Sequence, residues 1–288
     1  MGTGLTPRTI LITGAGGLLG GCVDAAFADA GFRTAAATHA ELDVTDPAAV
    51  SAAMDRLRPE LVVHCAAMTN VDACESEPDA ARAINEAGSA NVAEAADAAG
   101  AAVVAVSTDY VFDGTKGTPY LENDDTNPLQ AYGLTKLEGE VAVRAAADRH
   151  FVVRSAWIYG RGGKNFISRL PDLAAAGAPI TAVMDQTGSP TYAPDLARAI
   201  VALSRTQAYG TYHVTNSGSC TFSELCRLAL QLSSIDAEVQ DVLRRDLGRP
   251  APRPENTTLA NEAWRALGLA PLRDWRQALA EFVGGGPS

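Results

Sequence analysis

Short apolar runs alternate with longer Ala-rich segments of helical periodicity through the first half of the chain. Such apolar runs predict strands that are buried on both faces, and the intervening periodicity predicts amphipathic helices. The predicted strands are Thr9–Thr13, Arg33–Thr38, Leu61–His64, Val103–Ser107 and Phe151–Ser155, and the predicted helices are Leu18–Ala30, Pro47–Arg58, Pro78–Ala99 and Leu129–Ala147. The alternation is typical of βαβ units and predicts an α/β fold with a doubly wound parallel sheet.

The pattern changes after about residue 160 into a Gly-rich segment and less regular apolar runs, which predict a smaller lobe. The expected elements are strands at Ile180–Met184 and Thr211–Val214, helices from about Pro194 and Thr221, a loop at Arg249–Pro254, and terminal helices that carry Trp264 and Trp275. We therefore predict a sheet domain over residues 1–160, completed by later returning segments, and a C-terminal lobe formed mainly by residues 161–288. Ligands of open α/β sheets bind beyond the carboxyl ends of the strands, so a shared cleft is expected there.

Three glycines follow the first predicted strand and open the first predicted helix: Gly14, Gly17 and Gly20. The first permits a tight turn, the second lets a pyrophosphate approach the backbone, and the third lets helix and strand pack closely. The free N–H groups and the positive dipole end of the helix favour an anion. Because the run lies between a strand and a helix, it favours a dinucleotide site over a purely structural turn. Residues 1–160 are therefore predicted to form a Rossmann-like NAD(P)-binding domain.

The end of the second predicted strand bears on the choice of dinucleotide. Most NAD sites place an Asp or Glu there to hold the ribose hydroxyls, whereas residues 34–39 read TAAATH. A strand end without a carboxylate accommodates a 2′-phosphate, which favours NADPH, or the use of both NADPH and NADH. Farther on, Asp43 and Val44 precede a helix. Asp43 is expected either to accept a hydrogen bond from the adenine amine or to be a plain surface or capping carboxylate.

A tyrosine and a lysine, Tyr132 and Lys136, are four residues apart in a predicted helix, a spacing that places both side chains on one face. An ammonium beside a phenol stabilises the phenolate and lowers the tyrosine pKa, which makes the tyrosine a usable proton donor and acceptor. The same spacing also arises by chance on exposed helices. Thr108, at the end of the fourth predicted strand, adds a hydroxyl at the mouth of the same cleft and favours the catalytic interpretation.

The composition narrows the classes of function. Among 288 residues, 23 Lys and Arg stand against 34 Asp and Glu, and a chain with a net charge of −11 repels polyanions, which excludes nucleic acid as a partner. Five cysteines without a C-x-x-C pair indicate reduced thiols rather than a disulfide framework or a zinc site. No apolar run is long enough to cross a bilayer, so we expect no membrane partner and a cytoplasmic protein.

Six segments together resemble one protein family. They are TGAGGLLG at residues 13–20, HCAAMTNVD at 64–72, STDYVFDG at 107–114, YGLTK at 132–136, RSAWIYG at 154–160 and DQTGSPT at 185–191. These segments are similar to those of the extended short-chain dehydrogenase/reductases, specifically the dTDP-4-dehydrorhamnose reductase family. The resemblance covers nearly the whole chain. It implies an NAD(P)H-dependent oxidoreductase that reduces the C4 ketone of a nucleotide-linked 4-keto-6-deoxyhexose.

The resemblance also implies residue roles. Tyr132 would protonate the developing alkoxide, Lys136 would hold the nicotinamide ribose and tune Tyr132, and Thr108 would hydrogen-bond the carbonyl oxygen. Leu18 and Leu19 would join the glycines at the pyrophosphate, Ala66, Ala67 and Met68 would follow the third strand against the cofactor, and Asp109, Trp157 and Arg253 would contact the sugar nucleotide. For Trp157 the alternative is a core aromatic.

Four further residues are candidates for supporting roles. A nucleotide sugar is dianionic, so Arg161, Lys164 and Arg249 are further candidates for its phosphates, although solvated loop charges fit them equally well. Asn85 matches a family asparagine near the active site and is expected to support it.

The metal site known in some members of this family is not expected here. In those members a magnesium ion bridges a dimer through carboxylates, and the first two matching positions of this chain are Cys22 and Pro194, leaving only Glu281. A thiol and a proline cannot replace hard oxygen ligands for magnesium. We therefore expect no metal, and a monomer or a metal-independent homodimer.

Two other functions remain open. A 4,6-dehydratase or 4-epimerase of a sugar nucleotide fits the fold, but related dehydratases carry an Asp-Glu pair after the threonine, whereas Asp109 is followed here by Tyr110. A non-catalytic regulatory subunit could be built on the same fold, since fold does not fix function. The presence of Tyr132, Lys136 and Thr108 argues against that second alternative.

Overall fold

The computed structural model describes residues 9–163, 165–177 and 179–285. Six parallel strands form the central sheet in the order β10-β5-β4-β3-β1-β2. They are β1 (Thr9–Thr13), β2 (Arg33–Ala37), β3 (Leu61–His64), β4 (Ala102–Thr108), β5 (His150–Ser155) and β10 (Gly210–His213). The order of connection reverses between β1 and β3, which is where ligands of doubly wound sheets bind. The predicted fold class is confirmed.

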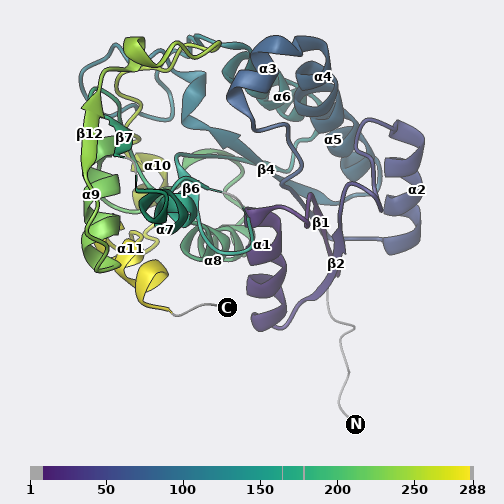
Figure 1. Cartoon of the computed structure of the whole chain (residues 1–288). Helices are drawn as coiled ribbons and strands as arrows, with labels where there is room; N and C mark the ends of the chain where they lie inside the picture. Colours follow the sequence, from purple (N-terminus) through teal and green to yellow (C-terminus); the bar gives the residue numbers. More distant parts are fainter. Residues whose placement is uncertain (1–8, 164, 178, 286–288) are drawn as a thin grey trace.

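Helices cover both faces of the sheet (Figure 1). One face carries α1 (Leu18–Asp29) and α8 (Ala193–Ser204), and the other carries α2 (Pro47–Leu57), α5 (Gly88–Ala98) and α6 (Ala131–Ala146). Successive strand residues point to opposite faces, so Ile10 packs in the first layer and Leu11 in the second. Because both of their faces are buried, the inner strands β1, β3, β4 and β5 contain continuous apolar runs rather than an alternating pattern.

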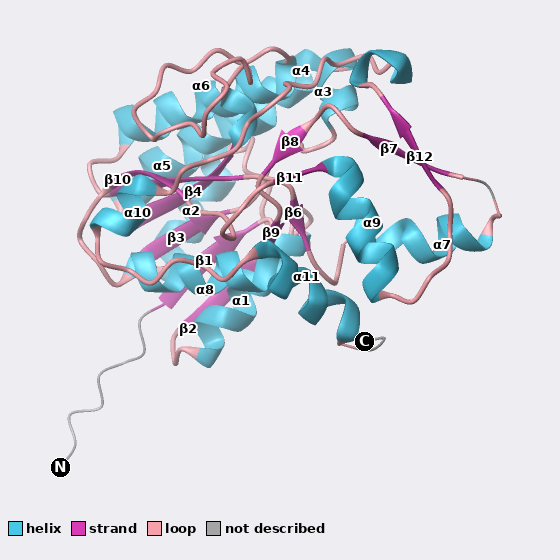
Figure 2. Ribbon diagram, turned by 90° about the vertical axis from the view of Figure 1, so that its left-hand side faces the viewer, coloured by secondary structure: helices cyan, strands magenta, loops and turns pink. Residues whose placement is uncertain are grey.

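A smaller assembly lies away from β2, at the other side of the molecule (Figure 2). It contains the parallel pair β7 (Ile180–Val183) and β12 (Val239–Val242), the pair β6 (Ile158–Tyr159) and β9 (Thr191–Tyr192), the pair β8 (Thr187–Gly188) and β11 (Cys220–Thr221), and the helices α7 (Leu170–Ala175), α9 (Phe222–Leu232) and α11 (Trp275–Gly284). Tyr159, Leu225 and Trp275 belong to its apolar core. Between these elements the chain returns to the sheet as α8, β10 and α10 (Glu262–Ala266).

The helix predicted over residues 78–99 is interrupted. It consists of α4 (Pro78–Arg82), a π-helical turn (Ala83–Ala87) and α5, and it is preceded by the unpredicted helix α3 (Val71–Ser76). The π turn holds Asn85, which is wholly buried, against α6. A Cβ at Gly139 of α6 would lie 2.2 Å from the Asn85 carbonyl oxygen, so only glycine permits this approach. Periodicity alone did not indicate the turn, because one extra residue barely alters the apolar pattern.

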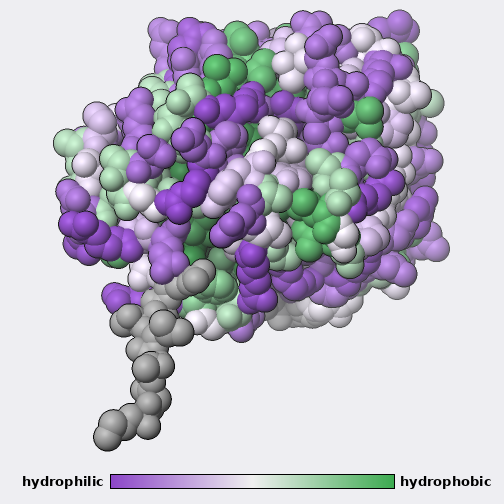
Figure 3. Space-filling view, turned by 180° about the vertical axis from the view of Figure 1, so that it is seen from behind, coloured by the Kyte–Doolittle hydropathy of each residue, from purple (hydrophilic) through white to green (hydrophobic). Residues whose placement is uncertain are grey.

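The surface is mixed in character. On the face drawn in Figure 3, apolar atoms gather in separate patches among polar ones. The exposed large apolar side chains include Leu129, Leu134, Val141, Met184 and Leu232. Among the described residues, no helix combines the length and the apolar character that crossing a bilayer requires.

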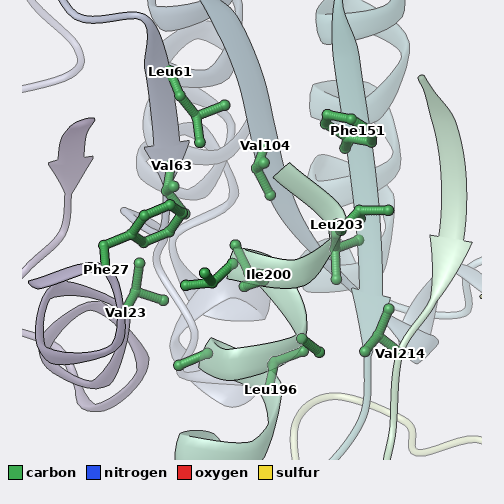
Figure 4. Close-up of a cluster of buried hydrophobic side chains, with 14 of the residues drawn as sticks. Val23, Phe27, Leu61, Val63, Val104, Phe151, Leu196, Ile200, Leu203 and Val214 are labelled. Carbon is green, nitrogen blue, oxygen red and sulfur yellow. The ribbon is translucent and has the colours of Figure 1, made fainter. Parts of the chain in front are cut away.

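The larger apolar core lies between the sheet and the α1/α8 layer. Figure 4 shows Val23 and Phe27 of α1 and Ile200 of α8 directed toward side chains of the sheet such as Val63 and Val104. These side chains are essentially inaccessible to solvent. This packing fixes the start of α1 relative to the strand ends, and therefore the geometry of the turn that joins them.

Candidate active site

A cleft of about 880 Å³ opens beyond the carboxyl ends of the central strands. Its volume falls within the range of roughly 300–1,000 Å³ that is usual for ligand pockets. The predicted site residues that line it are Gly14, Gly17, Leu18, Leu19, Gly20, Asp43, Val44, Ala66, Ala67, Thr108, Asp109, Tyr132, Lys136 and Trp157. The fold thus brings together residues that are far apart in the sequence, while their individual roles stay predictions.

The glycine turn between β1 and α1 is closely packed. Gly14 has a φ of 70°, and a Cβ there would lie 2.6 Å from the Ala66 backbone nitrogen. A Cβ at Gly20 would lie 2.3 Å from the Gly14 carbonyl oxygen. Gly17 is the N-cap residue of α1, and the first turn of a helix leaves its N–H groups without helical acceptors. The turn therefore has the backbone geometry and the donors that a pyrophosphate requires.

Other features of the cleft also suit a dinucleotide. Ala66 and Ala67 follow β3 and offer small side chains beside the turn. The Ser155 hydroxyl at the end of β5 is buried, lines the cleft, and makes no hydrogen bond to any described residue. Buried hydroxyls normally have a partner, so a polar group of a ligand is expected to supply it. The residues present therefore fit a nicotinamide dinucleotide.

Lys136 and Tyr132 lie one turn apart on α6 and both line the cleft. The Lys136 ammonium donates to the Val106 carbonyl oxygen at 2.7 Å, and burial lowers the pKa of Lys136 to about 8, although the Glu140 carboxylate opposes this. Burial raises the pKa of Tyr132, and an interaction with the Thr108 hydroxyl opposes it. The ammonium is directed to β4, and the tuning of Tyr132 by Lys136 stays a prediction. A phenol with a raised pKa keeps its proton at ordinary pH.

Asp109 is a wholly buried carboxyl next to Thr108. The Thr108 hydroxyl donates to Asp109 Oδ1 at 3.2 Å, and the Thr257 hydroxyl donates to Asp109 Oδ2. Burial raises the pKa of Asp109 to about 7, and the two hydroxyl donors reduce the shift. The group can therefore exchange a proton near neutral pH.

The stability of Asp109→Asn relative to the unsubstituted protein is expected to increase as the pH rises. The folded state keeps a proton that the unfolded chain releases, so stability falls as the pH rises from the usual range of aspartate to about 7. An amide cannot ionise and escapes this loss. Thermal unfolding at about pH 5 and about pH 8 should show a variant-minus-parent difference in Tm that is more positive at the higher pH. A difference that stays constant with pH would contradict the raised pKa.

Trp157 forms an aromatic wall of the cleft with Phe166. Its backbone has a φ of 44°, an unusual value for a bulky residue, and its ring packs against Gly188, where a Cβ would lie 2.5 Å away. The ring also meets Phe222 edge to face, with 5.4 Å between centroids. Trp157 therefore both packs in the smaller lobe and faces the cleft, which combines the two alternatives that its sequence position left open.

Two carboxylates lie in the segment that follows β2, and Asp43 is the one that lines the cleft. Asp43 Oδ1 accepts from the Thr45 amide at 2.9 Å and from the Thr45 hydroxyl at 2.8 Å. These hydrogen bonds lower the pKa of Asp43. The cap of α2 is Asp46, whose side chain accepts from the amides of Ala48 and Ala49, so the prediction of a capping role for Asp43 is wrong. Glu41 accepts in the same way from the amide and hydroxyl of Thr38, directly after β2. The sequence motif indicated no carboxylate at the end of β2. In the structure, however, the Glu41 side chain folds back to Thr38 at that strand end.

Some predicted residues lie outside the lining of the cleft. Arg253 forms a two-pronged ion pair with Asp72 at 2.7 and 3.0 Å, which ties the loop at residues 249–254 to α3.

The Met68 amide donates to Asn85 Oδ1 at 2.8 Å, and Asn85 Nδ2 donates back to the Met68 carbonyl, so Asn85 supports this segment as expected. Arg161 donates to the Phe282 carbonyl, Arg249 is exposed, and Lys164 lies outside the described residues.

Of the positions weighed for a metal, which are Cys22, Pro194 and Glu281, the last is paired with Arg273. Arg273 binds Asp195 at 2.8 and 3.0 Å and also pairs with Glu281, and burial raises the pKa of the Cys22 thiol. Within the described part of the chain, no three His, Cys, Asp or Glu residues are grouped to hold a metal ion. Metal independence stays a prediction.

Several contacts at the site were not predicted from the sequence. Glu140 lies one turn beyond Lys136 on α6, Thr257 reaches Asp109 from a distant loop, and the Gln186 amide donates to the Tyr110 hydroxyl at 3.0 Å. Only Glu140 could have been found by extending the helix face from Tyr132 and Lys136 by another turn. The other pairs depend on tertiary contacts between distant segments.

Comparisons with known proteins agree with this arrangement. A family model described as "RmlD substrate binding domain" matches residues 8–285. The chain is 42% identical over 278 residues to a dTDP-4-dehydrorhamnose reductase of Streptomyces griseus, with 94% of this chain and 91% of that protein covered. It is 43% identical over 274 residues to a probable dTDP-4,6-dihydroxy-2-methyloxan-3-one 4-ketoreductase of Streptomyces antibioticus, with 94% and 93% covered.

Solved structures give the same result. The dTDP-4-dehydrorhamnose reductase of Bacillus anthracis in complex with NADP superimposes with a TM-score of 0.95 at 34% identity, covering 98% of this chain and 100% of that chain. A UDP-glucose 4-epimerase of Thermus thermophilus in complex with NAD, at 20% identity and a TM-score of 0.83, shares the fold. The resemblance drawn from the six segments is confirmed. The chain belongs to the dTDP-4-dehydrorhamnose reductase family.

Proposed function

We propose that the protein is an NADPH-dependent reductase of the C4 ketone of a nucleotide-linked 4-keto-6-deoxyhexose, namely dTDP-4-dehydrorhamnose or a related dTDP-4-keto sugar. The observation that carries the proposal is the meeting of Tyr132, Lys136 and Thr108 with the glycine turn in one cleft. The B. anthracis reductase that superimposes on the chain is in complex with NADP, which supports the choice of cofactor. The relatives at about 40% identity are named as reductases of dTDP-linked keto sugars, which supports the substrate class.

The side chains of the cleft supply the proton chemistry of such a reduction. When bound, the reduced nicotinamide supplies a hydride to the ketone carbon. Tyr132 donates its phenolic proton to the ketone oxygen, and its raised pKa keeps that proton in place until negative charge develops on the oxygen. The Thr108 hydroxyl donates a hydrogen bond to the same oxygen, and the Lys136 ammonium holds the ribose hydroxyls. One hydride and one proton together convert the ketone into the alcohol.

The sugar nucleotide is proposed to bind between the sheet domain and the smaller lobe. Asp109 and Trp157 would contact the sugar, and Arg253, already held by Asp72, would face the phosphates of the nucleotide. The division into a cofactor domain over residues 1–160 and a substrate lobe mainly over 161–288 belongs to this proposal. So do a cytoplasmic location and a monomer or metal-independent homodimer.

The decisive experiment follows NADPH absorbance with a panel of 4-keto-6-deoxy sugar nucleotides, in parallel with NADH. We expect oxidation that depends on both enzyme and ketone, with NADPH at least as efficient as NADH by kcat/KM. Product NMR then gives the configuration at C4. A 4,6-dehydratase or 4-epimerase would convert a sugar nucleotide with no net oxidation of NADPH, and a regulatory subunit would show no turnover. Either result would overturn the proposal.

A further inference from the structure

Glu140 is a buried carboxylate on α6, one helical turn beyond the predicted catalytic residue Lys136. It follows Lys136 by four residues and Tyr132 by eight on α6, so the three share one helix face. Its side chain is 1% exposed. Nothing in the chemistry proposed above uses Glu140, and an ionised carboxylate is costly to bury unless it is paired and hydrogen-bonded.

Four donors hold this carboxylate. Oε1 accepts from the Ser107 hydroxyl at 2.5 Å and from Arg154 Nε at 2.9 Å. Oε2 accepts from Arg154 Nη2 at 2.8 Å and from Arg144 Nη1 at 3.1 Å. Burial alone would raise the pKa of Glu140, but the hydrogen bonds and charges of the arginines, with Ser107, outweigh it and lower the pKa. Glu140 is therefore an anion at working pH.

A buried ion pair is weak support for stability, because apolar residues of similar volume often serve as well. The position of Glu140 offers another explanation. Ser107 lies next to Thr108 at the end of β4, and the Lys136 ammonium donates to the carbonyl of Val106 in the same strand. Glu140 thus lies on the helix that carries Tyr132 and Lys136 and contacts the strand segment that ends in Thr108.

The remaining groups around Lys136 carry no charge at neutral pH. Burial lowers the pKa of His64, the last residue of β3, to about 3 and raises the pKa of the Cys65 thiol, which follows β3, to about 12, so both stay neutral. On α6, Tyr132 keeps its proton. Of the described groups that raise the pKa of Lys136, Glu140 is the ionised one, while burial acts in the opposite direction.

We propose that Glu140 is a positioning residue of the reductase: its fixed negative charge keeps Lys136 an ammonium ion inside the cleft. The inference rests on the proposed function for its catalytic meaning, but the state of Lys136 can be measured without substrate. Removing the charge takes away the ionised carboxylate that raises the pKa of Lys136, and the ammonium form becomes less stable.

The chain has three lysines, Lys116, Lys136 and Lys164, which makes a direct titration practicable. Protein labelled with ¹³C and ¹⁵N in lysine gives one set of side-chain NMR signals for each of the three lysines, and Lys136→Arg identifies the set that belongs to Lys136. In Glu140→Gln the titration midpoint of Lys136 is expected to fall by about one pH unit relative to the parent protein. The matched control is Glu138→Gln, which removes a carboxylate of the same helix whose partner is the exposed Arg82 and should leave the midpoint unchanged.

Glu140→Gln leaves Arg154 buried without its partner and can fail to fold. The double variant Glu140→Gln with Arg154→Gln removes both charges of the pair, and its reference is Arg154→Gln alone, because these two proteins differ only in the anion at residue 140. A fall in the Lys136 midpoint in whichever variant folds supports the proposal. An unchanged midpoint in folded protein overturns it, because a merely structural Glu140 would affect Tm without moving the titration of Lys136.

Activity links the titration to catalysis. The alkaline limb of kcat/KM for NADPH-dependent reduction should move to lower pH by the same amount as the Lys136 midpoint, and it should not move in Glu138→Gln. A limb that stays in place while the midpoint shifts would overturn the positioning role. If the parent protein reduces no 4-keto sugar nucleotide, the proposed function has failed, and the lysine titration still decides the effect of Glu140 on Lys136.

Discussion

Tyr132→Phe is expected to lower kcat for ketone reduction by roughly two to four powers of ten, the range for loss of a general acid. Burial raises the pKa of the Tyr132 phenol, which lines the cleft together with Thr108 and Lys136, so the phenol holds a proton that it can donate. Phenylalanine keeps the ring and its edge-to-face contact with Tyr110, at 6.1 Å between centroids, so the cleft should keep its shape. NADPH affinity, measured by fluorescence titration, should therefore change little.

Tyr110→Phe is the matched control for this substitution. It removes the same hydroxyl from the neighbouring ring, where the group accepts a hydrogen bond from Gln186 and has its pKa raised by burial to about 12. Loss of one neutral hydrogen bond is worth about 0.5–1.5 kcal/mol, which corresponds to a rate effect of about tenfold at most. Near-normal turnover by Tyr132→Phe, or equal losses in the two variants, would show that Tyr132 is not the proton donor.

Features that depend on short spacings could be predicted from the sequence. The three glycines, the Tyr132–Lys136 helix face and the hydroxyl of Thr108 at a strand end each require only a local geometry and the rule that parallel strands end at one edge. The alternation of strands and helices likewise indicated both helical layers, although α6 begins at Ala131 rather than Leu129. Local chemistry and sheet topology were therefore sufficient to predict these features of the fold and the site.

Features that depend on long-range packing could not be predicted. The ordinary effect of an ammonium on a nearby phenol suggested a lowered pKa for Tyr132, but in the structure Lys136 is bound to Val106 and burial dominates. The contact of Thr257 with Asp109 joins residues 148 positions apart. No spacing rule covers such a pair, because the loop that carries Thr257 is positioned by the smaller lobe.

Gly20→Ala is expected to weaken NADPH binding by about one to two powers of ten in Kd, since overpacking of about 1–3 kcal/mol must be relieved by moving the turn. The added methyl group would lie 2.3 Å from the Gly14 carbonyl oxygen and 2.8 Å from the Ala15 Cα, and both atoms belong to the backbone. No side-chain rotation can relieve the contact. The start of α1 must then separate from the end of β1, which displaces the N–H groups that would hold the pyrophosphate.

Gly21→Ala, one position further along α1, separates this steric effect from the general effect of alanine in a helix. Its methyl group would meet the Ala15 carbonyl oxygen at 3.7 Å, an ordinary contact. Both substitutions gain up to about 1 kcal/mol of helix propensity, so Gly21→Ala should match or exceed the parent protein in Tm, whereas Gly20→Ala should fall below it. Equal Kd values for NADPH in the two variants would mean that close packing of the turn does not shape the dinucleotide site. A difference confined to Gly20→Ala ties cofactor affinity to the 2.3 Å approach itself.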